Sequence, residues 1–364
     1  METQASGDAS DGFVSESSDD DDRWVTPPSR ERNFSPWAST MLELATFSPA
    51  ESVPTVAASV PGWRARTRGR LTDLFGQFPR TVSLNPEITD TVDCGSYTRE
   101  RIVFDVEATM SVPAYLLVPK TRRRQGPAVI AIHGHGPGKD HVAGVVAGTD
   151  VPQATPDAYA HQLVEAGYVV LAPDMRGFGE RADWVPDGKY FCDANLVAAA
   201  AAGRNPLTAN IHDLVGAMNL LEEHPLVDPS RIGVVGFSYG ATLALFLAAW
   251  DTRLRTAVVS GYFSSWHSAH RVPHNLCGSQ VLFGMLGVLE HVDLAALVAP
   301  RALLIESGDE DPLFPVGDAR EALVELESVY HAMRAPSGAL EHHVFAGDHR
   351  FDGSTMLRFL ERWL

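Results

Sequence analysis

The stretch GVVGFSYGAT, residues 233–242, places a serine between two glycines directly after a short apolar segment. The apolar residues predict a buried strand, and the Ala-rich run over residues 239–250 predicts a helix. A serine in the pattern G-x-S-x-G between a strand and a helix lies on a sharp turn that can present its hydroxyl as a nucleophile. Glycines flank it because side chains there would collide with the strand or the helix. An ordinary strand-to-helix turn is the alternative interpretation of the same residues.

Ser238 needs a base, because a hydroxyl is a weak nucleophile at neutral pH unless a histidine and a carboxylate act with it. The candidate base is His349, which lies in HHVFAGDHRF, in the loop after the last predicted strand. His342 and His343 lie within that strand, so we expect them to be packing or surface residues.

The candidate acid follows another buried strand, in ESGDEDPLFP, which offers Glu306, Asp309 and Asp311. We expect Asp311 to orient the histidine, and Asp309 is the second choice. Serine, aspartate and histidine then follow one another in the order typical of a nucleophile on a strand-to-helix turn. The predicted catalytic residues are Ser238, Asp311 and His349.

Two backbone amides are predicted to form an oxyanion hole. One belongs to Tyr239, at the positive end of its helix, and the other to His135, in the loop HGHGPG that follows a buried strand. His133 and His135 also suggest a metal site, but no third ligand follows at a recognisable spacing. Residues 134–139 suggest a phosphate loop, but Asp140 stands where such a loop needs serine or threonine. We therefore predict no metal and no cofactor.

The composition limits the class of partner. A formal net charge of -17 disfavours nucleic acid and anionic lipid, which need clustered Lys and Arg. Cys94, Cys192 and Cys277 cannot all pair and lack metal-ligand spacing, so a reducing compartment is favoured, by default the cytoplasm. The first residues have no apolar leader, and no apolar run is long enough to span a bilayer, so we expect no membrane partner.

Three parts are predicted along the chain. Residues 1–35 carry nine acidic and three basic side chains with few aliphatic ones, which favours a disordered acidic tail. Residues 36–96 form a helical N-terminal extension, with apolar residues at helical spacing over 37–47 and 63–78. Residues 97–364 begin with two antiparallel strands, 102–107 and 112–118, at one edge of a sheet, and then alternate strands with helices. This pattern predicts a mainly parallel central sheet with helices on both faces and a ligand site at the carboxyl ends of its strands.

The residues from about 97 to 364 resemble the α/β-hydrolase superfamily, more narrowly its acetyl-xylan-esterase-like and dienelactone-hydrolase-like branch. The phrases AIHGHGPGK, VVLAPDMRGFGER, VDPSRIGVVGFSYG, APRALLIESGDEDPLFP and GDHRF carry the resemblance. It implies hydrolysis of a small-molecule carboxylic ester through an acyl-enzyme, with Ser238, Asp311 and His349 at the positions of the family's triad. Dienelactone hydrolases proper carry a cysteine nucleophile, so Ser238 weakens the reading as a lactone-specific enzyme.

Two segments, 179–205 and 262–289, are predicted to build the cap and the pocket. Their aromatic residues include the candidate substrate contacts Trp184, Tyr190, Phe263 and Trp266, although we expect at least half of these aromatics to be core. Two other functions stay open. The same triad could serve a lactonase, a peptidase or a C–C bond hydrolase of secondary metabolism, or the scaffold could be a non-catalytic ligand-binding protein.

Overall fold

The computed structural model describes residues 35–46, 48–146, 149, 152–183, 191–271 and 275–364. Contacts divide the chain between Phe47 and Ser48 into two units. In the first unit the described part is helix α2 (Pro36–Ala45), where the Ser35 hydroxyl accepts a hydrogen bond from the Ala38 amide at 3.2 Å. Apart from Ser35, the predicted acidic tail lies outside the described residues.

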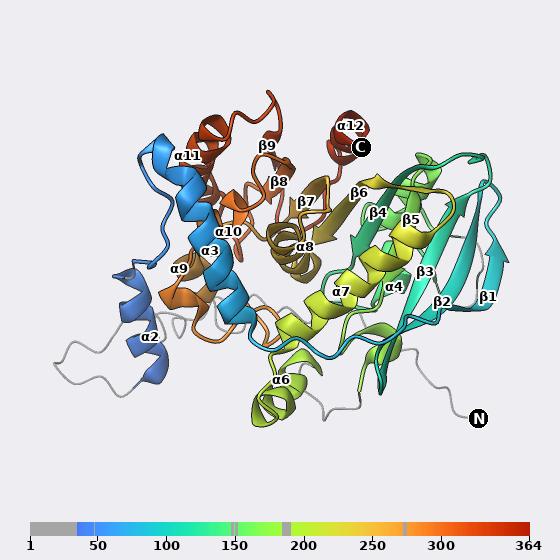
Figure 1. Ribbon diagram of the computed structural model, residues 1–364, viewed down its shortest axis with the longest axis horizontal. Coiled ribbons are helices and arrows are strands. Elements are labelled where there is room, and N and C mark those ends of the chain that lie inside the picture. The colour runs from blue at the N-terminus through green and yellow to red at the C-terminus, as the bar shows by residue number, and fades with distance from the viewer. Residues whose placement is uncertain (1–34, 47, 147–148, 150–151, 184–190, 272–274) are drawn as a thin grey trace, which may run out of the picture. The chain divides into compact units, whose positions relative to one another are not determined.

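The described part of the second unit, residues 48–364, is built on a nine-stranded sheet in the order β1-β2-β3-β5-β4-β6-β7-β8-β9 (Figure 1). The pairs from β5 through β9 are parallel, and β1, β2 and β3 join antiparallel at one side. The predicted mainly parallel sheet is confirmed. The strands are β1 (Glu87–Asp93), β2 (Tyr97–Glu107), β3 (Met110–Pro119), β4 (Gly126–Ile132), β5 (Val169–Pro173), β6 (Val227–Phe237), β7 (Thr256–Ser260), β8 (Ala302–Gly308) and β9 (Leu340–Phe345).

Helices pack on both faces of the sheet, as the sequence predicts. Figure 1 shows α7 and α8 crossing one face, where both contact β4 and β6. On the other face, α5 and α12 share a core with Val129, Ala131 and Val235, the alternate residues of the central strands. The described helices of this unit are η1 (Ala57–Ser59), α3 (Val60–Phe75), α4 (Lys139–Val142), α5 (Tyr159–Glu165), η2 (Gly179–Arg181), α6 (Phe191–Ala201), α7 (Pro206–Glu223), α8 (Tyr239–Trp250), α9 (Trp266–Arg271), η3 (Met285–Gly287), α10 (His291–Ala296), α11 (Val316–Ala332) and α12 (Met356–Trp363). Within the described residues, none of the helices is both long and apolar enough to cross a membrane.

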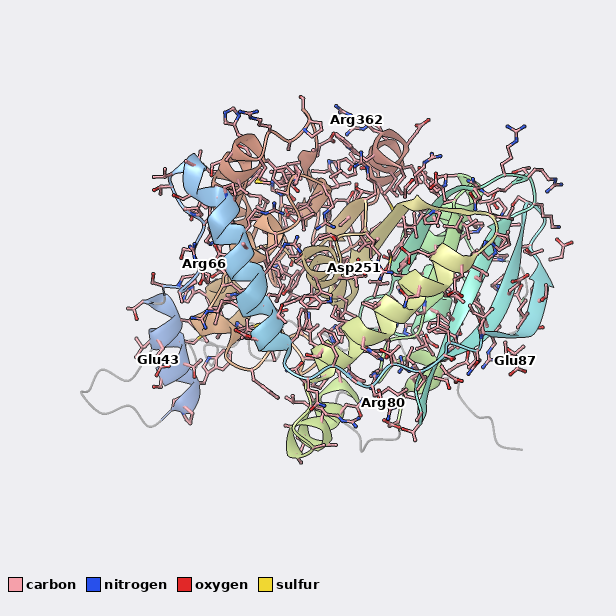
Figure 2. The ribbon with its side chains drawn as sticks, viewed as in Figure 1. Glu43, Arg66, Arg80, Glu87, Asp251 and Arg362 are labelled. Carbon is pink, nitrogen blue, oxygen red and sulfur yellow. The ribbon has the colours of Figure 1, made fainter. Side chains whose placement is uncertain are left out.

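The residues before position 97 contain a strand that the sequence did not predict. Strand β1 pairs antiparallel with β2 and forms the border of the sheet, where Figure 2 labels Glu87 at its first position. The two strands predicted for the edge of the sheet are β2 and β3, and they are instead the second and third strands from that edge. Most side chains of β1 are exposed, so the strand has no apolar alternation that would have predicted it.

The two segments predicted to build the cap contain short helices that are tied together. Segment 179–205 holds η2 and α6, and segment 262–289 holds α9 and η3. The Gly278 amide donates to Asp193 Oδ1 at 2.8 Å, and Asn205 Nδ2 donates to the Val281 carbonyl at 3.1 Å. The two segments thus form one structure although residues 206–261 separate them in the sequence.

Candidate active site

Ser238 lies on the turn between β6 and α8 with φ 53° and ψ -117°. A positive φ is strained for a residue with a side chain, and such strain is typical of functional turns. A Cβ atom at Gly236 would lie 2.1 Å from the Gly240 carbonyl oxygen, and one at Gly240 would lie 2.0 Å from the Ile132 carbonyl oxygen. The predicted need for two glycines is confirmed, and the Ser238 amide fixes the turn by donating to Ser260 at 2.9 Å.

The three residues predicted to act together meet at the carboxyl edge of the sheet. His349 Nε2 lies 2.9 Å from Ser238 Oγ, and His349 Nδ1 lies 2.8 Å from Asp311 Oδ2. Asp311 follows β8 and His349 follows β9, so neighbouring parallel strands deliver them to the same edge. The Asp311 side chain is 1% exposed and that of His349 is 19% exposed. The carboxylate is shielded, whereas the imidazole reaches solvent.

The carboxylate beside His349 is held in place by the backbone. Asp311 Oδ1 accepts hydrogen bonds from the amides of Leu313, at 2.8 Å, and Phe314, at 3.1 Å. Its other oxygen is left for the imidazole. The second choice, Asp309, instead accepts a hydrogen bond from the Gly347 amide at 2.9 Å and so ties the loop of His349 to β8.

The remaining titratable candidates have structural partners. Glu306 lies within β8, where burial raises the pKa of its carboxyl, and it accepts a hydrogen bond from the Thr355 hydroxyl at 3.2 Å. His342 bonds to Ser307 and His343 to Asp352, each at 3.1 Å, so both histidines pack along β9 as expected.

Two aromatic rings limit the orientation of the His349 imidazole. The Phe237 ring centroid lies 5.0 Å away and the Phe314 centroid 5.7 Å away. Gly261 leaves room beside the imidazole, since a Cβ atom there would lie 3.3 Å from His349 Cε1 and 2.8 Å from the Phe237 ring. The ring is therefore placed by packing as well as by its two hydrogen bonds.

The loop after β4 lies directly beside Ser238. A Cβ atom at Gly134 would be 3.6 Å from the Ser238 Cβ atom, so this loop lies against the turn from which α8 begins. Amides in the first turn of a helix have no partner within the helix, and they point to its positive end. This placement suits the Tyr239 and His135 amides for an oxyanion hole, and that role stays a prediction.

His133 supports this loop from inside, a role that sequence reasoning missed. Its Nε2 accepts a hydrogen bond from the Met175 amide at 3.0 Å, so Nδ1 carries the proton and donates to the Gly134 carbonyl at 2.7 Å. Burial lowers the pKa of His133 to about 4, which keeps the imidazole neutral. A histidine directly after a buried strand is the only sequence signal for such a role.

A buried ion pair anchors the far end of the same loop. The Asp174 carboxylate accepts from both the amide and the ammonium group of Lys139, each at 2.7 Å, and from the Glu180 amide at 3.0 Å. Gly138 and Gly179 leave the space for this carboxylate, because a Cβ atom at either would lie within 2.3 Å of it. Lys139 lies in AIHGHGPGK and Asp174 in VVLAPDMRGFGER, and no sequence signal indicates that the two residues pair.

Two hollows flank η2, beside the loop after β4. One, of about 490 Å³, is lined by residues 135–137 and 177–180 together with Asp140 and Ala182. The other, of about 630 Å³, is lined mainly by residues of β2, β3 and α6 and by residues 176–177 and 180–183. Both are lined by Gly177, Glu180 and Ala182, so the segment after β5 forms the wall between them.

Of the four predicted substrate contacts, the structure describes two. Trp184 and Tyr190 lie outside the described residues. Phe263 and Trp266 are 1% and 0% exposed, and the Trp266 indole N–H donates to the Leu289 carbonyl at 2.7 Å. Both are thus core residues of the cap segment, and this burial argues against direct contact with a substrate.

One further group could hold a metal. His135, Cys192 and Cys277 each place a ligand atom within 4.8 Å of the others, although the sequence spacing gave no sign of a third ligand. All three cysteines of the chain are free thiols.

Comparison with known proteins agrees with this architecture. The model of the dienelactone hydrolase family matches residues 112–351. The protein YtaP of Bacillus subtilis (strain 168), assigned by name to the hydrolases, is 27% identical over 314 residues that cover 83% of this chain and 100% of YtaP.

Two solved structures show the same fold at low sequence identity. A protein of Bacteroides fragilis NCTC 9343, assigned by name as an acetyl xylan esterase, has a TM-score of 0.79 and 17% identity, and the match covers 94% of this chain and 99% of that one. A glucuronoyl esterase of Solibacter usitatus has a TM-score of 0.60 and 16% identity, with 85% and 94% covered. Together with the family match, these structures confirm the α/β-hydrolase fold.

Proposed function

Since the chain belongs to the dienelactone hydrolase family of ester-cleaving enzymes, we propose that it hydrolyses carboxylic esters through an acyl-enzyme formed on Ser238. The observation that carries the proposal is the continuous hydrogen-bonded chain from Ser238 Oγ through the His349 imidazole to Asp311. Three side chains from three loops would have no packing reason to align in this order. Nucleophile, base and orienting carboxylate are the parts that acyl transfer needs.

In the first half of the reaction, His349 Nε2 takes the proton of Ser238 as Oγ attacks the ester carbonyl carbon. Asp311 accepts the Nδ1–H bond, which keeps the other nitrogen free to act as a base, and it stabilises the imidazolium that forms. The negative oxygen of the tetrahedral intermediate receives hydrogen bonds from the Tyr239 and His135 amides. The intermediate then collapses, and the imidazolium gives its proton to the leaving alcohol.

In the second half of the reaction, a water molecule attacks the acyl group while His349 takes a proton from that water. The second tetrahedral intermediate uses the same two amides, and its collapse returns the proton to Ser238 Oγ and releases the acid. Every one of these steps uses side chains and amides of this chain.

An ester of a small molecule is the substrate class that we propose. The hollow of about 490 Å³ is lined by His135, whose amide we assign to the oxyanion hole, so it offers space for part of a small ester near Ser238. Both named structural neighbours are called esterases. Ser238 in place of a cysteine nucleophile favours open-chain esters over a specialised lactonase. Lactonase, peptidase and C–C bond hydrolase activities on the same triad are tested by product assays on lactones, peptides and β-diketones, where we expect little turnover of the last two.

The test of the mechanism replaces Ser238 by alanine and follows p-nitrophenyl acetate hydrolysis. Because the nucleophile is lost, we expect kcat/KM to fall by at least about 10⁴-fold. Labelling by a fluorophosphonate, mapped to its peptide by mass spectrometry, should mark Ser238 in the wild type and nothing in the variant.

The matched control is Ser337→Ala, at an exposed serine of the second unit, which should hydrolyse and label like the wild type. Turnover retained in Ser238→Ala would contradict the assignment. Tight ligand binding without any acyl-enzyme would instead favour a non-catalytic binding protein.

A further inference from the structure

A cluster of soft metal ligands lies next to the loop after β4, outside the triad. His135 comes from that loop, Cys192 from α6, and Cys277 from the segment that precedes η3. Both thiols are buried, with 0% and 5% of the residues exposed, whereas the histidine is exposed. One ligand atom from each residue lies within 4.8 Å of the other two.

The spacing of these atoms is close to that of a tetrahedral zinc site. With Zn–S near 2.3 Å and Zn–N near 2.05 Å, a sulfur and a nitrogen on one zinc ion lie roughly 3.6 Å apart. Cys192 Sγ and His135 Nε2 lie 3.9 Å apart, so a shift of a few tenths of an ångström would bring both into the first shell. The exposed side of His135 leaves the fourth position to water.

Two buried hydroxyls beside the cluster provide a second, independent observation. Tyr239 Oη and Ser279 Oγ are both fully buried and interact with each other, and neither has a further hydrogen-bond partner within the described part of the chain. The Tyr239 ring lies 5.1 Å from that of His135, and Ser279 is two positions from Cys277. Each hydroxyl therefore has hydrogen-bonding capacity left over in a buried place, and polar groups that surround a metal's ligands orient those ligands.

The backbone around the cluster is already held in place. The Gly278 amide bonds to Asp193 at 2.8 Å, next to Cys192, and the Cys277 amide bonds to Gln280 at 3.0 Å. Gln280 in turn donates to the Thr242 hydroxyl on α8 at 2.8 Å. The two thiols therefore face each other without any rearrangement of the chain, which reduces the entropy that metal binding would cost.

We propose that His135, Cys192 and Cys277 bind one Zn²⁺ ion, with water as the fourth ligand. Two thiol sulfurs and an imidazole nitrogen suit zinc, whereas magnesium and calcium require oxygen ligands. On binding, the two thiols release their protons to solvent and coordinate as thiolates. The site goes beyond the proposed hydrolysis, which needs no ion, and it would tie both cap segments to the loop after β4.

The test titrates the reduced, metal-free full-length protein with Co²⁺ as a spectroscopic probe, and then with Zn²⁺ in competition with a chelating dye. We expect one Co²⁺ per chain, a thiolate-to-cobalt charge-transfer absorption in the near ultraviolet, and displacement of cobalt by zinc. Cys192→Ala and Cys277→Ala should each weaken zinc binding by at least about a hundredfold, more than the roughly 10–100-fold cost of losing an outer-shell partner. Cys94→Ala, at the half-buried thiol outside the cluster, is the matched control and should bind like the wild type.

Absence of the charge-transfer absorption in the wild type would overturn the proposal, and this result does not depend on whether any variant folds. Zinc binding that survives in the Cys192→Ala/Cys277→Ala double variant would overturn it too. A third result would also overturn the proposal: the reduced wild-type protein binds no zinc and, on air oxidation, forms a Cys192–Cys277 disulfide. Because none of these measurements uses ester hydrolysis, failure here is distinct from failure of the proposed function.

Discussion

At the scale of single residues, the site depends on one strained serine and on hydrogen bonds that hold it there. The positive φ of Ser238 costs about 1–3 kcal/mol, which the surrounding structure must offset. The Ser238 amide bonds to Ser260 on the neighbouring strand, and the Ser238 carbonyl accepts from Thr242 in the first turn of α8. The hydroxyl is thus fixed toward His349 before any substrate arrives.

The choice between the two aspartates can be tested at this scale. Asp311→Asn would keep the size of the side chain but remove the charge that stabilises imidazolium and favours the required imidazole tautomer. We expect kcat for p-nitrophenyl acetate to fall by about 10⁴-fold, the loss typical of this change in Ser-His-Asp enzymes, with little change in melting temperature.

Asp309→Asn is the matched control, because an asparagine oxygen can still accept the hydrogen bond from the Gly347 amide. It should retain most of the wild-type kcat. The opposite pattern, with Asp309→Asn inactive and Asp311→Asn active, would make Asp309 the orienting acid.

At the scale of elements, the junction between α9 and α10 contains a carboxyl group that links stability to pH. Burial raises the pKa of Glu290 to about 7, although its Oε1 accepts hydrogen bonds from the amides of Trp266, at 2.8 Å, and His291, at 2.7 Å. Nearby carboxylates add to the shift, and burial also raises the pKa of Asp293, in the same capping box, to about 7.

Because folding raises the pKa of Glu290, the free energy of unfolding depends on pH. An unfolded glutamate has a pKa of about 4.3, so between roughly pH 4 and 7 the folded protein binds more protons than the unfolded one. The contribution of Glu290 to stability is therefore complete below about pH 4 and is lost as the pH rises through 7. Glu290→Gln keeps an oxygen for both amides but does not titrate, so its free energy of unfolding should decline less steeply from pH 5 to 8.

Urea unfolding at several pH values measures this effect. Glu327→Gln, at an exposed carboxylate on α11, serves as the control and should follow the wild-type curve. An unfolding free energy of Glu290→Gln that runs parallel to the wild type over this range would show that Glu290 does not titrate there.

The sequence predicted elements well where local pattern and burial agree. Strands β4, β5 and β7 are nearly continuous apolar runs, as are the second half of β6 and the first half of β8, and the strand-to-helix turn at Ser238 has its own glycine pattern. The sequence did not predict β1, because the polar residues of an edge strand are not distinguished from a loop until the pairing strand is known. The cluster of His135, Cys192 and Cys277 was missed for a related reason, since its spacing exists only after the cap segments pack together.

At the scale of the whole molecule, the sequence and the structure place the start of the catalytic part differently. The sequence predicts a domain from residue 97, whereas contacts group residues 48–364 into one unit. Helix α3 accounts for much of the difference. Its Trp63, Leu71 and Phe75 are almost fully buried, and Phe75 packs edge-on against Phe246 and Trp250 of α8.

Two truncated chains distinguish these boundaries. A chain that starts at Ser48 keeps the sheet, α3 and the triad, so we expect it to fold and to hydrolyse p-nitrophenyl acetate with kcat within about twofold of the full chain. A chain that starts at Tyr97 lacks α3 and β1. The three large apolar side chains of α3 contribute roughly 5–9 kcal/mol through burial, which is comparable to the whole stability of a typical domain.

The shorter chain also loses hydrogen bonds that join α3 to the rest of this unit. The Phe75 carbonyl accepts from the Thr208 hydroxyl on α7 at 2.8 Å, and the Arg64 guanidinium donates to the Leu297 carbonyl at 2.9 Å. Since α8 carries the nucleophile turn at its start, exposing the apolar surface that α3 covers should disturb the site as well as the core. We therefore expect the chain from Tyr97 to lose cooperative thermal unfolding and fluorophosphonate labelling together. If it instead melts and labels like the chain from Ser48, α3 and β1 are accessory, and the boundary at residue 97 is the correct one.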